Sequence, residues 1–171
     1  MNNGKGLKVA LAAVTVLTVL AGCRKEEKFP DEPRIAYARF EQFTDSSSLT
    51  ITFTDGDGDI GLSDTDVNPP FDTGSTFYNN LFLKLEGRRN GEWETPPFDV
   101  DLNYRIPYLT PTGQNKTLKG EISVALSNSV LAIGQGTGGS NIYDAVRFEI
   151  KLVDRALHES NTALSGEILL Q

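Results

Sequence analysis

Residues 48–54 read SLTITFT and predict the class of fold. Leu49, Ile51 and Phe53 alternate with threonines, so every second side chain is apolar and its neighbours are polar and β-branched. Successive side chains of a strand point to opposite faces, and this period of two is typical of a half-buried β-strand. Residues 145–154, AVRFEIKLVD, alternate in the same way. The two segments predict sheets with one buried face.

Further strands are expected where short apolar segments stand between clusters of glycine, proline, asparagine and serine. We see no internal repeat and no convincing amphipathic helix, although residues 127–133 suggest a helical turn and 134–141 a loop. Seven to eight short strands predict an antiparallel β-sandwich of immunoglobulin or fibronectin type over residues 34–171. The additional strands are expected at 35–43, 81–87, 92–95, 102–108, 118–126 and 163–170.

The sequence also predicts one specific tight turn. Asn90-Gly91 is a strong signal for a two-residue hairpin. That hairpin pairs Arg88 with Trp93 and leaves Trp93 partly exposed.

The composition suits one acidic globular domain. A chain of 171 residues with 39 % hydrophobic residues has the length and the apolar material for a single core. Its formal net charge is −7. Binding to nucleic acid depends on a basic stripe that neutralises phosphates, and no such stripe is present. Nucleic acid is therefore not an expected partner.

The first 22 residues have the layout of a secretory signal peptide, with a short basic start and an apolar run at 9–20. As a helix, that run spans about 18 Å, which is short of a hydrocarbon core of about 30 Å. Residues 20–23, LAGC, resemble the lipobox of bacterial lipoproteins. The resemblance implies that the Cys23 thiol carries diacylglycerol, and the chain has no second cysteine for a disulfide. Several acyl chains together anchor a protein stably in a membrane.

Residues 23–33 read as a lipidated cysteine followed by a polar, proline-bearing tether. Residues 25–27, KEE, resemble the export signal that carries Bacteroidota lipoproteins to the outside of the outer membrane. A simple hydrophilic spacer is the alternative interpretation. The expected location is the outer membrane, on the cell surface, held by the lipid anchor.

The segment that is richest in chemistry is 52–66, TFTDGDGDIGLSDTD. A strand that continued past Phe53 would bury Asp55, Asp57 and Asp59 on the core face, where unpaired carboxylates are costly. The chain is therefore expected to leave the sheet here, with glycines permitting tight turns. Alternating aspartates can converge on one point, and Ca²⁺ takes about 6–8 oxygen ligands. The segment predicts a calcium loop, with a solvated acidic turn, another cation or a partner's Lys or Arg as alternatives.

The spacing of these acids resembles an EF-hand loop, although Ile60 stands where that loop needs glycine and the flanks are not helical. It is more similar to the strand-borne, aspartate-rich calcium loops of extracellular adhesion proteins. In an immunoglobulin-like sandwich, the loop after the second strand shares a pole with the loop between the last two strands. Asp154 is then expected to complete the shell, with capping of a turn as its alternative role. The expected metal ligands are Asp55, Asp57, Asp59, Ser63, Asp66 and Asp154.

Three segments, FTDGDGDIGL, YRIPYLTPTGQNKTLKGEI and VRFEIKLVDRALHESN, resemble a group of Bacteroidota surface lipoproteins in which an Asp/Gly-rich loop lies on an immunoglobulin-like domain. The resemblance implies an envelope location and no activity.

No enzymatic motif is supported. Glycines at 134, 136 and 139 match G-x-G-x-x-G but precede a strand pattern, whereas a dinucleotide site needs a helix. His158 is the single histidine, G-x-S-x-G is absent, and no pair of acids is singled out for glycoside cleavage. The expected function is non-catalytic binding of a protein or glycan, or scaffolding. The alternatives are a surface glycan-binding accessory lipoprotein of an uptake system, with Trp93, Tyr104 and Tyr108 as a stacking platform, and a hydrolase of unfamiliar type.

Overall fold

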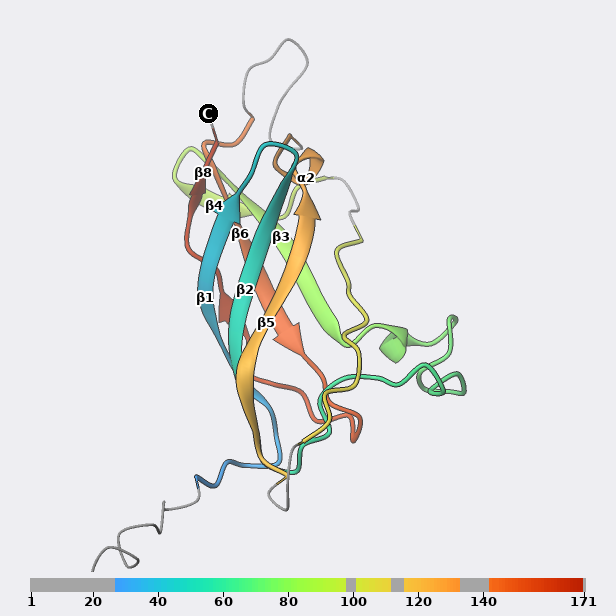
Figure 1. Cartoon of the computed structure of the whole chain (residues 1–171). Helices are drawn as coiled ribbons and strands as arrows, with labels where there is room; N and C mark the ends of the chain where they lie inside the picture. Colours follow the sequence, from blue (N-terminus) through green and yellow to red (C-terminus); the bar gives the residue numbers. More distant parts are fainter. Residues whose placement is uncertain (1–26, 98–100, 112–115, 133–141, 171) are drawn as a thin grey trace, which may run out of the picture.

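The computed structural model describes residues 27–97, 101–111, 116–132 and 142–170 (Figure 1). Within these residues, eight strands form two antiparallel sheets that pack together as a β-sandwich, which confirms the predicted fold class. No helix in the described ranges has the length and hydropathy needed to span a membrane. The predicted signal peptide at 1–22 and the predicted lipidation site Cys23 lie outside the described residues.

The first sheet contains the segment that predicted the fold. Leu49, Ile51 and Phe53 are buried against the second sheet, as their alternation requires. Thr50 is also buried, and its hydroxyl lies 2.8 Å from that of Ser123 on the neighbouring strand. The strand order is β1 (Arg34–Gln42), β2 (Ser46–Asp55) and β5 (Leu118–Ser127).

The second sheet has the order β4-β3-β6-β7, and β8 also pairs with β6. The Asn90-Gly91 hairpin joins β3 to β4; both residues have positive φ, and Arg88 pairs with Trp93 as predicted. The strands are β3 (Leu81–Arg89), β4 (Glu92–Glu94), β6 (Ala145–Leu152), β7 (Ala163–Leu164) and β8 (Ile168–Leu169). Two short helices complete the described elements, η2 (Thr76–Tyr78) and α2 (Ser129–Ala132).

The core lies between the two sheets. From β6 it receives Phe148, Ile150 and Leu152, which are all 0 % exposed. Leu49 and Ile51 of β2 belong to the same apolar cluster. Complete burial of one such side chain contributes about 1.5–3 kcal/mol, so the alternating segments of both sheets supply much of the driving force for folding.

Residues 102–108 are not a strand, contrary to the prediction. They make two isolated bridges, from Tyr104 to Leu81 and from Pro107 to Leu62. Pro107 has no amide hydrogen and cannot continue a ladder. Because the Tyr104 backbone bonds Leu81 of β3 and its hydroxyl donates to the Ala125 carbonyl of β5 at 2.9 Å, the segment joins the two sheets along one side.

The predicted strand at 163–170 is divided into β7 and β8. Between them, the Ser165 hydroxyl accepts a hydrogen bond from the Phe148 amide at 2.8 Å, and the Ser165 amide donates to the Phe148 carbonyl. A side-chain oxygen thus takes the place of a backbone carbonyl in the ladder, and the regular strand is interrupted.

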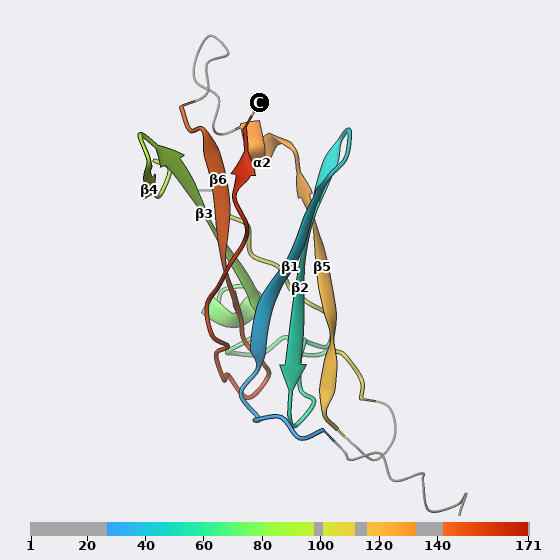
Figure 2. The same cartoon turned by 90° about the vertical axis from the view of Figure 1, so that its left-hand side faces the viewer.

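The two ends of the sandwich differ. The β1–β2 turn lies at one end, whereas β2 and β6 both run to the opposite end (Figures 1 and 2). Residues 27–33, which lead into β1, reach that opposite end as well. The loops after β2 and β6 therefore meet at one pole.

Candidate metal site

Asp55 is the last residue of β2 and is fully buried. Its Oδ2 accepts hydrogen bonds from the amides of Gly58 at 2.8 Å and Asp59 at 3.1 Å. These bonds turn the chain back over the end of the strand. Gly58 has φ +76°, and a Cβ there would collide with the Lys116 carbonyl oxygen. The turn that the alternating Asp and Gly residues predicted is therefore built around the Asp55 carboxylate.

Asp154 comes from the second sheet, two residues after the end of β6, and is 1 % exposed. Its Oδ1 accepts a hydrogen bond from the His158 amide at 2.8 Å, and its Oδ2 lies 2.9 Å from His158 Nδ1. The side chain thus holds its own loop closed. This geometry explains why an acidic residue stands at the end of a hydrophobic strand.

Asp59 connects the two loops. Its Oδ2 accepts a hydrogen bond from the Ala156 amide at 3.0 Å, and its backbone carbonyl accepts one from the Arg155 amide at 3.3 Å. The loop that follows β2 is therefore fastened to the loop that follows β6, and the carboxylate of Asp59 is carried to that of Asp154.

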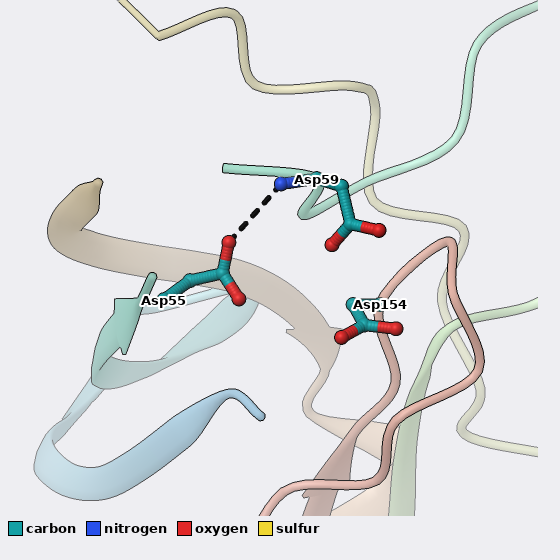
Figure 3. A group of neighbouring side chains, drawn as sticks. All are labelled: Asp55, Asp59 and Asp154. Carbon is teal, nitrogen blue, oxygen red and sulfur yellow. Dashed lines mark hydrogen bonds between the residues drawn. The ribbon is translucent and has the colours of Figure 1, made fainter. Parts of the chain in front are cut away.

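One ligand oxygen from each of Asp55, Asp59 and Asp154 lies within 4.8 Å of the others. Figure 3 shows the three carboxylates gathered around one space, from strand end, turn and opposite loop. Oδ1 of Asp55 and Oδ1 of Asp59 are buried and have no hydrogen-bond partner among the described residues. Leaving such acceptors unpaired costs about 1–3 kcal/mol each, and a hard cation takes oxygen ligands of this kind. The acidic triad Asp55/Asp59/Asp154 can therefore hold a metal ion.

The electrostatics of the triad agree with its geometry. Burial, reinforced by the nearby charge of Asp57, raises the pKa of Asp55 to about 7. Burial raises the pKa of Asp59 to about 6, and the charge of Asp154 adds to the effect. The pKa of Asp154 is also raised by burial, although its bonds to His158 oppose the shift. Without a counter-charge, the carboxylates disfavour one another's ionised forms.

The structure gives the other three predicted ligands different surroundings. Asp57 adjoins the triad, and its Oδ1 is also buried without a partner in the described part of the chain. Asp66 forms an ion pair with Arg155 at 3.0 Å and accepts a hydrogen bond from the Ser63 amide at 2.7 Å. The Ser63 hydroxyl lies 3.0 Å from that of Thr65. Asp66 therefore supports the loop of Asp154 through Arg155 rather than reaching the triad.

Two contacts of this pole had no signal in the sequence. Gly56 lies against the backbone carbonyls of Phe29 and Pro30, which leave no room for a Cβ, so the residues before β1 cover the acidic turn. The Asn161 side chain accepts from the Ile35 amide at 3.0 Å and donates to the Ile35 carbonyl at 2.9 Å. It binds the start of β1 to the loop after β6 as a strand would.

The aromatic residues considered for sugar stacking have separate partners. Trp93 is half-buried and packs under the guanidinium of Arg147, 4.2 Å from the ring centroid, with that of Arg88 at 5.6 Å. The Tyr104 hydroxyl bonds to β5, as described above. Tyr108 packs with the guanidinium of Arg155, 5.1 Å from its ring centroid.

Comparison of the chain with protein-family models and with curated proteins found no match. The chemistry of the molecule is therefore inferred from its own residues. These residues offer a set of carboxylate oxygens that come from the end of β2 and from the loops after β2 and β6, gathered at one pole.

Proposed function

We propose that this chain is a lipid-anchored protein of the cell envelope that acts by binding or scaffolding rather than by catalysis, with a calcium ion stiffening its acidic pole. The observation that carries the proposal is the convergence of Asp55 at the end of β2, Asp59 in the turn after it and Asp154 in the loop after β6. An ion held there joins the two sheets of the sandwich at their common end.

The donor set favours calcium over other ions. The ligands are carboxylate oxygens, which suit a hard cation, whereas zinc prefers nitrogen and sulfur. The nearby His158 imidazole is occupied by Asp154 through Nδ1. Ca²⁺ accepts about 6–8 oxygens in flexible geometry, so Asp57 can contribute alongside the triad, while Mg²⁺ requires a near-ideal octahedron and retains waters.

A structural role for the ion follows from the position of its ligands. A divalent cation would neutralise converging carboxylates and satisfy the buried oxygens of Asp55 and Asp59. It would also fix the loops after β2 and β6 relative to each other. A rigid pole suits a binding or scaffolding surface because less entropy is lost when a partner docks.

The lipid anchor is supported by the lipobox-like residues 20–23. Residues 27–33 come to the pole that carries the acidic triad (Figure 1). Attachment at Cys23 in the outer membrane would therefore hold this pole as the end nearest to the anchor. Exchange of Cys23 for alanine should release the chain from the membrane fraction, and undiminished retention would contradict the anchor.

Thermal unfolding tests the calcium site. The full chain in mild detergent is heated with excess calcium and with excess chelator. A ligand at about 100 times its Kd stabilises the folded state by about 2.7 kcal/mol. For a chain of this size each kcal/mol raises Tm by about 2–4 °C. Asp59→Asn should abolish the shift and Asp45→Asn, in the distant β1–β2 turn, should retain it. Equal Tm values with calcium and chelator would overturn the metal proposal.

A further inference from the structure

The connection between β2 and β3 contains a second feature, separate from the acidic triad. Residues 56–80 include only the short helix η2 among regular elements, and they form most of the wall of an open hollow of about 480 Å³. Its walls include Asp64, Asp66, Phe71, Asp72, Tyr78 and Arg105. This volume is within the usual range for small-molecule sites, about 300–1,000 Å³.

Arg105, in the segment 102–108 that joins the two sheets, fixes the shape of the hollow. Its Nη1 donates to the carbonyls of Phe71 at 3.3 Å and Tyr78 at 2.6 Å. Its Nη2 donates to those of Ser63 at 3.1 Å and Asp66 at 2.9 Å. Long connections in compact domains are usually functional or disordered, and this one is fixed by four bonds from a single guanidinium. The hollow is thus a built feature of the fold.

The charge of the hollow is negative. Asp64 is exposed, and its carboxylate has no ion-pair or hydrogen-bond partner in the described part of the chain. Oδ1 of Asp72 is buried and has no partner there either. Asp66 is paired with Arg155, and Arg105 directs its donors at backbone carbonyls. Carboxylates therefore outnumber the guanidinium groups around the hollow, and an anionic ligand is disfavoured.

The aromatic residues add a second recognition element. Phe71 and Tyr78 line the same hollow, and Tyr78 is 38 % exposed. The Arg105 guanidinium lies 5.1 Å from the centroid of the Tyr78 ring, so this ring already takes part in one cation–π contact. Aromatic faces attract ammonium and guanidinium groups, and carboxylates form charge-assisted hydrogen bonds with both.

We propose that the hollow bounded by Asp64, Asp72, Phe71 and Tyr78 binds a small organic cation through an ammonium or guanidinium group. The carboxylates supply charge and hydrogen-bond acceptors, and the rings supply the apolar wall. This binding site goes beyond the proposed function and does not depend on a metal at the triad. It gives the scaffold a ligand of defined chemistry.

Calorimetric titration of the full chain in mild detergent tests the site. Excess chelator is present throughout, so that the result is independent of the calcium proposal. Glucosamine supplies an ammonium group, methylguanidine a guanidinium group, and glucose is the uncharged match for glucosamine. At least one cation should bind with Kd of roughly 1 mM or tighter, and more weakly as salt screens the carboxylates. Binding by glucosamine alone identifies an ammonium site, and binding by methylguanidine alone a guanidinium site.

Variants assign the binding to this hollow. Asp64→Asn should weaken binding about tenfold, equivalent to about 1.4 kcal/mol, and Tyr78→Leu several-fold. Both positions are exposed, and an unchanged Tm verifies that the variants are folded. Asp45→Asn removes the same charge at the other end of the sandwich and should leave Kd unchanged. The proposal is overturned if neither cation binds up to roughly 10 mM, if glucose binds as well as glucosamine, or if both asparagine variants behave alike.

Discussion

Asp59 accepts a hydrogen bond from the Ala156 amide at 3.0 Å, across 97 positions of sequence. Through this contact the turn that ends β2 is joined to the loop that ends β6, and two sheets that pack through apolar side chains also meet through polar ones. The carboxylates of Asp55 and Asp154 are brought beside Asp59 as a result. The metal-binding capacity of the pole is therefore a property of loop docking.

The ligand set predicted from spacing and the triad seen in the structure can be distinguished by substitution. Asp66→Asn should cost about 1 kcal/mol, because it removes a partly buried ion pair with Arg155, yet it should preserve the calcium-induced rise in Tm. Asp154→Asn should abolish that rise. Thermal unfolding with calcium and with chelator measures both effects. Loss of the calcium response in Asp66→Asn, with the response intact in Asp154→Asn, would show that the ligands follow the EF-hand-like spacing.

The metal-free protein should become less stable as pH rises. The pKa of Asp55 goes from 3.8 to about 7 on folding, so the folded state binds this proton more tightly than the unfolded state. The free energy of unfolding should therefore fall between pH 3.8 and about 7, by an amount on the order of a few kcal/mol, and not change further on account of this group above that range. Asp59, with a pKa of about 6, acts in the same direction.

Denaturant unfolding in chelator at a series of pH values measures this dependence. Asp55→Asn should make the profile shallower, because an amide cannot ionise, and should leave the part that is due to Asp59, whereas Asp45→Asn should follow the unmodified chain. A profile for Asp55→Asn that coincides with that of the unmodified chain would exclude Asp55 as its source.

The acidic turn should tolerate no side chain at Gly58. This residue has φ +76°, and a Cβ would meet the Lys116 carbonyl oxygen and the Pro111 ring. Gly58→Ala should lower the free energy of unfolding by about 1–3 kcal/mol or more. Gly74 is the matched control, since nothing lies within 4 Å of its Cβ position and Gly74→Ala should change stability by less than about 0.5 kcal/mol. Equal stability of the two variants would mean that the turn is not held against residues 111 and 116.

The buried Asn80 side chain should stabilise the segment 102–108, which joins the two sheets. It is 2 % exposed; its Oδ1 accepts from the Ile106 amide at 2.6 Å, and its Nδ2 donates to the Ile106 carbonyl at 3.4 Å. Asn80→Ala should destabilise the chain by about 1–3 kcal/mol because the Ile106 amide is left buried and unpaired. Denaturant unfolding measures this decrease in the free energy of unfolding. Asn103→Ala, at an exposed position of the same segment, is the control.

The alternation of apolar and polar residues was sufficient to predict a strand where it continues over many residues. The alternation around Ile51 and Phe148 predicted both sheets, and Asn90-Gly91 predicted the hairpin and its Arg88–Trp93 pair. The same reasoning failed for 102–108, because Leu102 and Ile106 are spaced as in a strand but Pro107 cannot donate to a ladder. Periodicity indicates which side chains are buried. An irregular segment that packs against a core can show the same alternation of buried and exposed side chains as a strand.

The sequence by itself determined the alternating strands β2 and β6, the hairpin at Asn90-Gly91 and the presence of an acidic turn after β2, because these depend on neighbours in the chain. Tertiary structure decided which carboxylates converge. Asp66 is turned to Arg155, 89 positions away, while Asp154 reaches the triad from the other sheet. Each of these partners is chosen by the packing of two sheets and by the cost of an unpaired buried charge, and neither is encoded in the spacing of the acids.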